Sequence, residues 1–283
     1  MLKLIKDKMW NTDDQIVSSR NFILLREERS QFQGLRNENF VEIHLKASAY
    51  KGENDAYRFS VEISSFKQSN ANGMFKWVGD LHELRGKIVF SLDENGQLGK
   101  IHNLDDIQMK WQDLKPKIFL RHRDERYKGL LISGVEELLE DDERLSNALR
   151  YSQPYQLLFP GIQNKEFRKN EVVKGYREIP NFIAAKNIPI ITDEVLTETD
   201  DGKYEINVTG RIDEEKFEQN KVTAMLRILK NRPRVPTMVE LKYMERYLLE
   251  DWPWSSQSMC MSLVQIPGSL YYEEKNILKM IAG

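Results

Sequence analysis

The sequence predicts an α+β protein in which curved antiparallel sheets carry packed helices. Three observations lead to this fold class. Several stretches alternate apolar and polar residues with a period of two, as half-buried strands do. The turns between neighbouring stretches are too short for the crossover helix that parallel strands need. Strand-like and helix-like stretches also come in separate runs, which argues against parallel βαβ units.

The clearest strand pattern lies in the N-terminal third of the chain. Residues 41–47 and 57–63 each alternate apolar and polar side chains, and the short polar turn between them predicts an antiparallel hairpin. Residues 75–78 and 88–92 are expected to continue this sheet. The pair Asn95-Gly96 predicts a tight turn, because asparagine and glycine accept positive φ at low cost.

A helix is predicted directly after these strands. Asn103 is a candidate N-cap, and Ile107, Trp111 and Leu114 recur at three- and four-residue steps, so they share one face. We expect Trp111 to pack inward with its neighbours on that face. Pro116 is expected to end or kink the helix, because proline lacks the N–H that the preceding turn would bond.

A second helix is predicted from Ser133 to Leu149. Ser133 and Glu136 fit a capping box, and leucines form the apolar side of the helix. Acidic residues lie on the opposite side. A solvent-exposed face explains them, and a contact surface for a partner with a basic surface is the alternative. These acidic residues are Glu136, Glu137, Glu140, Asp141, Asp142 and Glu143.

Proline and glycine are concentrated between residues 152 and 189, which predicts a linker. The chain is therefore divided into a strand-rich N-terminal half with two helices, residues 1–160, and a C-terminal α+β half, residues 161–283. One continuous domain is the alternative. Each half contains a hairpin, an acidic glycine turn and a helix, so a duplicated architecture is a further alternative.

The C-terminal half repeats the strand pattern. Residues 190–208 predict a hairpin around an acidic glycine turn. Asp213 is expected to cap a following helix, and residues 239–243 and 259–263 are expected to form later strands. The last stretch, residues 270–281, fits either a strand or a short helix.

The composition excludes several classes of protein. The chain of 283 residues is 40% hydrophobic, which is too apolar for a disordered protein. Its net charge of −2 argues against a protein whose entire surface binds nucleic acid or an anionic membrane. The N-terminus lacks the apolar core of a secretory signal, and no apolar run approaches the roughly 20 residues of a membrane span. We therefore expect a cytoplasmic protein with neither a membrane span nor a nucleic-acid partner.

Motifs of established chemistry are missing from the sequence. Its Gly-Lys pairs lack the spacing of a phosphate-binding loop, and no Gly-x-Ser-x-Gly elbow is present. The histidines His44, His82, His102 and His122 show no metal-ligand spacing, and the loop around His122 is expected to be solvated. The single cysteine, Cys260, lies in an apolar alternating stretch and is expected to be buried and unreactive. No metal or cofactor is predicted.

One pattern fits a catalytic site. Glu240 and Lys242 would point to the same side of one strand, and Asp213 precedes them. An aspartate followed by Glu-x-Lys on a core strand resembles the motif of the restriction-endonuclease-like nucleases. The resemblance implies two acids that hold a divalent metal and a lysine that positions the attacking water. The interpretation we favour is an ordinary amphipathic strand, with Asp213 as a helix cap.

A carrier of an apolar ligand is a further alternative. A curved sheet that closes over the helices would hold a lipid in its groove. The groove would be lined by aromatic and methionine side chains that fill a core equally well. These are Trp77, Trp252, Trp254, Met259 and Met261.

Two stretches resemble known proteins. One runs from Leu92 through Asn103 to Trp111, and the other runs from the acidic-leucine helix to Pro160. Together they resemble a loose group of uncharacterised bacterial proteins, found mainly in Bacteroidota and in some cases encoded near type VI secretion or toxin–immunity loci. The resemblance implies a similar fold and carries over no catalytic residues.

The leading interpretation is a non-enzymatic protein-binding module, such as an adaptor, a chaperone or an immunity-type partner of a secreted bacterial protein. Its partner would be another protein. A metal-dependent nuclease that uses Asp213, Glu240 and Lys242 is the first alternative, and the apolar-ligand carrier is the second.

Overall fold

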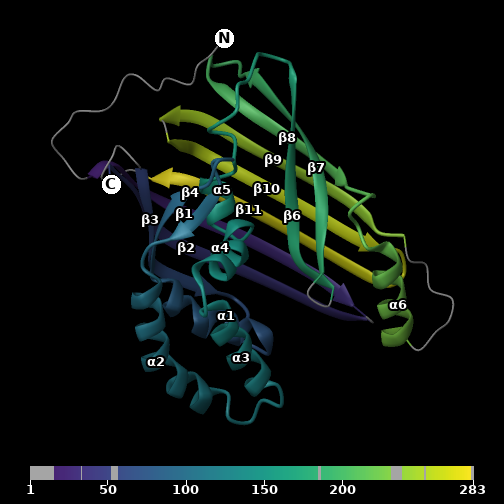
Figure 1. Ribbon diagram of the computed structural model, residues 1–283. Helices are drawn as coiled ribbons and strands as arrows, with labels where there is room; N and C mark the ends of the chain where they lie inside the picture. The colour runs from purple at the N-terminus through teal and green to yellow at the C-terminus, as the bar shows by residue number, and fades with distance from the viewer. Residues whose placement is uncertain are drawn as a thin grey trace. The chain divides into compact units, whose positions relative to one another are not determined.

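The computed structural model describes residues 16–32, 34–51, 57–183, 186–230, 238–251 and 253–281. Figure 1 shows their strands and helices. The strands are β1 (Ile16–Phe32), β2 (Leu35–Lys51), β3 (Tyr57–Gln68), β4 (Lys87–Leu92), β5 (Leu98–Ile101), β6 (Val172–Ile183), β7 (Lys186–Glu198), β8 (Tyr204–Ile212), β9 (Glu240–Asp251), β10 (Trp254–Ile266) and β11 (Leu270–Ile281). The helices are α1 (Met74–Leu81), the 3-10 helix η2 (His82–Arg85), α2 (Leu104–Arg121), α3 (Lys128–Leu138), α4 (Asp142–Arg150), α5 (Tyr155–Leu158) and α6 (Gln219–Lys230).

The described strands belong to one eleven-stranded antiparallel sheet. Its hydrogen-bonded order is β5-β4-β3-β2-β1-β11-β10-β9-β8-β7-β6. Every neighbouring pair except β1 and β11 is consecutive in the chain, and consecutive antiparallel strands need no crossover helix. The predicted antiparallel sheet is confirmed, and the protein is mostly β with some helices.

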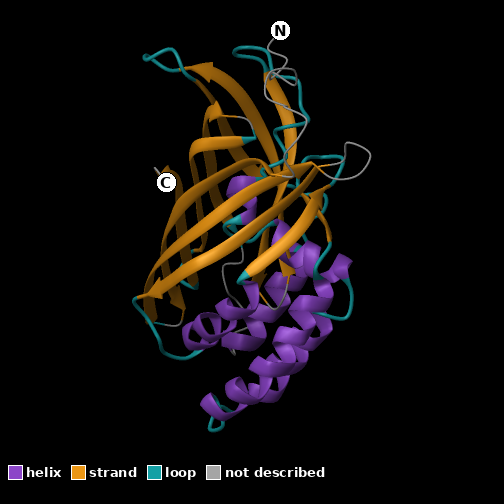
Figure 2. Ribbon diagram, turned by 90° about the vertical axis from the view of Figure 1, so that its left-hand side faces the viewer, coloured by secondary structure: helices purple, strands orange, loops and turns teal. Residues whose placement is uncertain are grey.

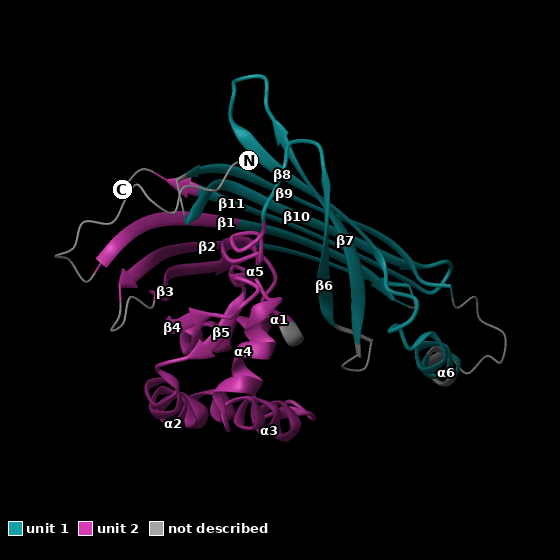
Figure 3. Cartoon of the chain, turned by 45° about the horizontal axis from the view of Figure 1, so that its top comes forward, with its two compact units in different colours: residues 1–4, 25–41, 166–279 teal, residues 5–24, 42–165, 280–283 magenta. Residues whose placement is uncertain are grey.

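The chain divides into two compact units, which Figure 3 colours separately. Unit 1 comprises residues 1–4, 25–41 and 166–279, and unit 2 comprises residues 5–24, 42–165 and 280–283. Among the described helices, α1 to α5 belong to unit 2 and α6 to unit 1. The two units therefore do not repeat one set of elements, and the duplicated architecture gains no support.

In unit 2, β4 and β5 form the predicted tight hairpin. Oδ1 of Asp93 accepts the backbone N–H groups of Asn95 and Gln97, each at 2.9 Å, and so closes the turn. Gly96 has a φ of 77°, which glycine adopts without the strain that a Cβ atom would cause. The turn prediction is confirmed.

Residues 75–78 were predicted as a strand, and this prediction is wrong because they belong to helix α1. Trp77, Leu81 and Leu84 recur at four- and three-residue steps, so α1 and the following η2 turn them toward one side. Trp77 and Leu84 are buried. A short apolar run of this length fits a helix and a strand equally well, and the tertiary packing decides between them.

Helix α2 carries the predicted buried face. Ile107, Trp111 and Leu114 are each at most 3% exposed. Pro116 was expected to end or kink this helix, but the helix continues to Arg121. The proline lies on the exposed side of the helix, where its ring meets solvent instead of packed side chains.

Asn103 precedes α2 as predicted but makes no side-chain cap bond. Its Oδ1 accepts the N–H of Val89 at 2.8 Å, and its Nδ2 donates to the carbonyl of Lys87 at 3.0 Å. The amide therefore fixes the start of α2 to strand β4. The capping prediction fails because the amide satisfies backbone groups of the neighbouring strand instead of those of its own helix.

The single helix predicted from Ser133 to Leu149 is two helices, α3 and α4. Ser133 is not an N-cap, because α3 already begins at Lys128. The break lies inside the acidic run, where Asp141 accepts the N–H of Arg144 at 2.7 Å and caps α4. Aspartate is a favoured N-cap residue, so it begins a new helix here.

The proline-rich segment predicted as a linker is in part packed into unit 2. Residues 154–162 are buried throughout. The ring of Phe159 lies 5.1 Å from that of Phe59 and 5.0 Å from that of Phe90, measured between centroids. Proline and glycine here shape a buried turn, and its aromatic residues hold it in the core.

Unit 1 contains strands β6 to β11, and each neighbouring pair in this series is antiparallel. Strands β7 and β8 form the predicted hairpin, with Ile190 opposite Ile212 and Glu198 opposite Tyr204. Strand β11 settles the alternative left open for residues 270–281, because it pairs with β10 along its length. No helix within the described residues is long and apolar enough to cross a membrane.

Candidate functional sites

The aspartate of the nuclease pattern differs in exposure from its glutamate and its lysine. Asp213 is buried, and its Oδ1 accepts the N–H groups of Glu215 at 3.2 Å and Lys216 at 3.4 Å. It therefore closes the turn after β8, whereas the expected role was a cap of α6, which begins only at Gln219. Within the described residues, no group of three or more His, Cys, Asp or Glu could hold a metal ion.

Glu240 and Lys242 lie on the exposed side of β9, as predicted. Gln265 of the neighbouring strand β10 donates to the Glu240 carboxylate. Tyr243, the next residue along β9, points to the buried side. The Glu-x-Lys pattern thus arises from an ordinary amphipathic strand.

Three of the six residues of the acidic run make side-chain contacts within the protein, and Glu137 and Glu143 are exposed. Glu136 pairs with Lys115, and Glu140 lies 2.7 Å from Arg144. Asp141 caps α4 through its side chain. Because the run also spans the break between α3 and α4, it does not form the acidic face of one helix.

The residues suggested to line an apolar groove do not share one environment. Trp77 is buried in unit 2, and Trp254 is buried in unit 1. Met259 and Met261 are half-buried and alternate along β10 with the buried Cys260, so they lie on the other side of the strand. Trp252 lies outside the described residues.

His122 corrects the expectation of a solvated loop. It is buried, and its ring stacks on that of Trp77 with a centroid distance of 3.9 Å. Its Nε2 lies 2.8 Å from Oδ2 of Asp80. The contact joins the end of α2 to α1, so His122 has a packing role.

Strands β6, β7 and β9 bury an ionic cluster on one face of unit 1. Nε of Arg177 lies 3.1 and 3.2 Å from the two carboxylate oxygens of Glu245, and its Nη2 lies 3.3 Å from Oε1 of Glu194. Tyr243 also donates to Glu245. The three charged side chains are at most 2% exposed. Gly175 makes room for this cluster, because a Cβ atom there would overlap the carboxylate of Glu194.

A second ionic cluster joins β1 and β11 in unit 1. Nη2 of Arg26 lies 3.0 Å from Oε2 of Glu28 and 3.3 Å from Oε2 of Glu274. Tyr272 donates to Oε2 of Glu274, and Nδ2 of Asn276 donates to Oε1 at 2.7 Å. Glu28 and Glu274 are each 17% exposed, so solvent reaches this cluster.

The two carboxylates of this second cluster differ in their pKa. Burial raises the pKa of Glu28 above its ordinary value, and Arg26 offsets only part of that effect. Burial also acts to raise the pKa of Glu274, but the charge of Arg26 and two side-chain hydrogen bonds outweigh it and lower the pKa. Glu28 is therefore the less stabilised anion of the pair.

Cys260 lies between the two clusters. On β10 it is opposite Glu245 of β9 and Asn276 of β11. The thiol is buried, and burial together with the nearby carboxylates raises its pKa well above the ordinary value. It has the buried environment predicted for it, but its neighbours across the sheet are charged and polar instead of apolar.

Neither ionic cluster was found from the sequence. Tyr243, Glu245 and Tyr247 alternate along β9, and Tyr272 and Glu274 do so along β11. These strands therefore place polar side chains on the buried face, which removes the hydrophobic alternation used to recognise buried strands. The repeated Tyr-x-Glu spacing was the available signal.

The end of α2 and the start of α3 expose large apolar side chains. Phe119 is 47% exposed, Leu120 70%, Tyr127 61% and Leu130 74%. Phe119 and Leu120 belong to α2, Tyr127 directly precedes α3, and Leu130 belongs to α3. Figure 1 labels the two helices, and Figure 2 shows the helices in purple. We call residues 117–130, with these four side chains, the α2–α3 corner.

Charged side chains surround the apolar residues of this corner. Nζ of Lys128 lies 4.7 Å from the ring centre of Phe119, and the guanidinium carbon of Arg126 lies 5.7 Å from that of Tyr127. Two acids, Asp124 and Glu125, are in the same loop. The corner thus combines apolar contact area with charges of both signs, among which cations are more numerous.

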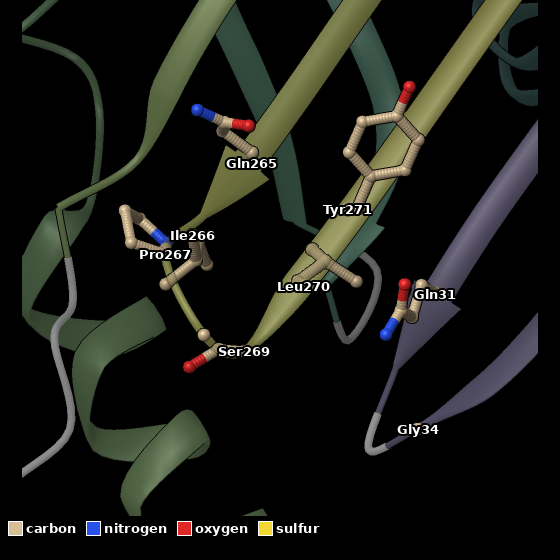
Figure 4. Close-up of a pocket in the computed structure, with 9 residues that line it drawn as sticks. Gln31, Gly34, Gln265, Ile266, Pro267, Ser269, Leu270 and Tyr271 are labelled. Atoms are coloured by element: carbon tan, nitrogen blue, oxygen red, sulfur yellow. The ribbon is translucent and has the colours of Figure 1, made fainter.

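A pocket of about 270 Å³ lies at the turn between β10 and β11 in unit 1. Figure 4 shows Gln265 and Tyr271 on the two strands, Pro267 and Ser269 in the turn, and Gln31 on β1. None of the lining residues carries a carboxylate, an imidazole or a thiol. This pocket therefore lacks the general acids and bases that most enzyme sites use.

Comparisons with known proteins identify no family for this chain. No protein-family model matches it, and no curated protein matches it. One solved structure, "Lipid-protein interactions in lipovitellin", is similar with a TM-score of 0.43 and 9% sequence identity. The match covers 96% of this chain and 26% of the other chain. A likeness this slight carries no conclusion about the fold, the ligands or the partners of this chain.

Proposed function

We propose that this protein is a non-enzymatic protein-binding module that docks its partner through the α2–α3 corner. The exposure of Phe119, Leu120, Tyr127 and Leu130 at the end of α2 and the start of α3 is the observation that carries the proposal. Removal of apolar area from water is favourable by about 25 cal/mol per Å², before the entropy costs of association are subtracted. Aromatic and arginine side chains are also enriched at the centres of protein interfaces.

The charges of the corner favour a protein partner with an apolar, mainly acidic surface. Arg126 and Lys128 lie against exposed rings, where a partner carboxylate could approach them. Asp124 and Glu125 are interleaved with these cations and would be repelled by a uniformly anionic bilayer. Mixed signs suit a protein surface that offers matching charges.

The sequence resemblance suggests the form of this function. A role as adaptor, chaperone or immunity-type partner of a secreted bacterial protein is part of the proposal. The proposal does not use the acidic run, because Glu136, Glu140 and Asp141 already pair with or cap groups of this chain and the run is divided between α3 and α4.

The test begins with a photo-crosslinking amino acid at position 130 in cells of the native host. A crosslinked protein is identified by mass spectrometry, purified, and titrated against the wild type and against a Leu120→Asp, Leu130→Asp double variant. Both leucines are at least 70% exposed, so the substitutions leave the core unchanged. We expect the double variant to bind at least about 30-fold more weakly, which corresponds to about 2 kcal/mol for an interface hot spot.

A matched control is Leu35→Asp, because Leu35 is 72% exposed but belongs to unit 1. Its affinity for the purified partner should equal that of the wild type. Equal weakening of binding by both changes, or no weakening by the double variant, refutes the corner as the docking surface.

Flotation with vesicles that contain phosphatidylglycerol is a separate experiment that tests for a membrane partner. Vesicle binding lost in the double variant, with no purified protein bound, would replace the protein partner with a membrane.

A further inference from the structure

We infer that the cluster of Arg26, Glu28, Glu274 and Asn276 in unit 1 is a binding site for a primary ammonium group. The group would belong to a small amine or to the side chain of a lysine. This site is separate from the α2–α3 corner, since its residues all lie in unit 1 and the corner lies in unit 2.

The charges of the cluster do not balance. One guanidinium, that of Arg26, faces two carboxylates, Glu28 and Glu274, which leaves one negative charge in a place that is 17–29% exposed. A partly buried charge without a full counter-charge is costly. Of the two carboxylate oxygens of Glu28, Arg26 contacts only Oε2, so Oε1 can accept a hydrogen bond from a ligand.

Asn276 supplies a hydrogen-bond acceptor that has no donor bonded to it. The residue is 2% exposed, and its Oδ1 has no hydrogen-bond partner within the described structure. Its orientation is set by Nδ2, which donates to Glu274 at 2.7 Å, so Oδ1 is the free end of the amide. A buried carbonyl oxygen that accepts no hydrogen bond lowers the free energy of unfolding by about 1–3 kcal/mol.

A second buried acceptor lies on the neighbouring strand. Ser258 on β10 is 1% exposed, and its Oγ also lacks a partner among the described residues. The strand register places Ser258 opposite Leu278 and Cys260 opposite Asn276, so Ser258 and Asn276 are diagonal neighbours. Their side chains lie on the same face, because both positions alternate with exposed or half-buried residues.

The chemistry of these groups selects the ligand. The carboxylate oxygen of Glu28 and the amide oxygen of Asn276 are both acceptors, so they fit a donor, and the excess carboxylate charge of the cluster favours a donor that is positively charged over the unpaired Nε of Arg26 as the group that a ligand meets. A primary ammonium is compact and offers three donors and no acceptor. Tyr272, which donates to Glu274, also brings a ring to the cluster, and rings attract cations. A metal ion is not favoured, because no group of three or more His, Cys, Asp or Glu in the described residues could hold one.

The experiment follows the side-chain amide of Asn276 by ¹H–¹⁵N NMR while propylammonium chloride is added to the intact protein. Sodium chloride keeps the ionic strength constant, and 1-propanol is the neutral isostere. We expect the Asn276 amide resonances to shift to saturation with propylammonium, with a Kd on the order of millimolar, and not to shift with propanol. Nα-acetyl-lysine methylamide, titrated in parallel, distinguishes a lysine side chain from a small amine.

Glu28→Gln removes the charge that binds the ammonium, so the affinity of the protein for propylammonium should fall by about tenfold or more. Glu27→Gln is the matched control, since Glu27 is the preceding residue of the same strand and is 47% exposed. It should bind as the wild type does. If Glu28→Gln does not fold, Asn276→Ser provides the second variant, read from the backbone amides of β11. The proposal is overturned if propylammonium shifts nothing up to high concentration, or if both glutamate variants bind alike.

Discussion

Replacement of Trp111 tests how unit 2 is held together. The side chain is 2% exposed and lies on the buried face of α2 with Ile107 and Leu114. Its indole Nε1 is buried and has no hydrogen-bond partner among the described residues. The residue therefore contributes apolar packing while it leaves one donor unsatisfied.

The magnitude follows from these two facts. Trp111→Ala removes the whole ring from a packed site, which costs about 3–5 kcal/mol in the free energy of unfolding. Trp111→Phe keeps a ring and removes the unsatisfied donor, whose burial costs about 1–3 kcal/mol. We therefore expect the phenylalanine variant to lose less than about 2 kcal/mol, because relief of that penalty offsets part of the lost volume.

The assay is urea unfolding followed by circular dichroism, with the two variants measured beside Met109→Ala. Met109 is on the same helix and 63% exposed, so its replacement should change stability by less than about 0.5 kcal/mol. A loss below 1 kcal/mol for Trp111→Ala would show that the ring is not packed as described. A larger loss for phenylalanine than for alanine would refute the argument about the indole donor.

Two further predictions concern the buried clusters of unit 1. Gly175→Ala should lower stability by at least about 2 kcal/mol in the same urea assay, because the new Cβ would overlap the carboxylate of Glu194, and no loss would mean that β6 and β7 shift apart freely. Cys260 should resist a thiol reagent at pH 8 in the folded protein and react fully in urea, because burial raises the pKa of the thiol and blocks access to it. Rapid labelling of the native protein would contradict the described environment.

Local turn chemistry in this sequence was readable without a structure. Asp93 and Asn95-Gly96 define their hairpin by themselves, since both the side-chain acceptor and the positive φ are properties of those residues. The four- and three-residue steps between Ile107, Trp111 and Leu114 likewise fix the buried face of α2. Such features depend on neighbours along the chain, so a sequence argument reaches them.

The errors occurred where residues far apart in the chain decide the outcome. Asn103 bonds β4 instead of its own helix, and Phe159 draws a proline-rich segment into an aromatic core. The buried ionic clusters are the extreme case, because Arg177 meets Glu245 and Arg26 meets Glu274 only after the strands pair. No local pattern shows that such charges are buried.

The sequence by itself determined the antiparallel strands, their turns and the amphipathic face of α2, because hydrophobic period and turn chemistry act over a few residues. Only the tertiary structure decided which charged side chains are buried together and which apolar ones stay exposed. Burial depends on what the rest of the chain places over a side chain. Leu130 on α3 and Leu145 on α4 are the same residue type, yet one is 74% exposed and the other 8%. That difference, which the packing of the fold sets, places the α2–α3 corner at the surface.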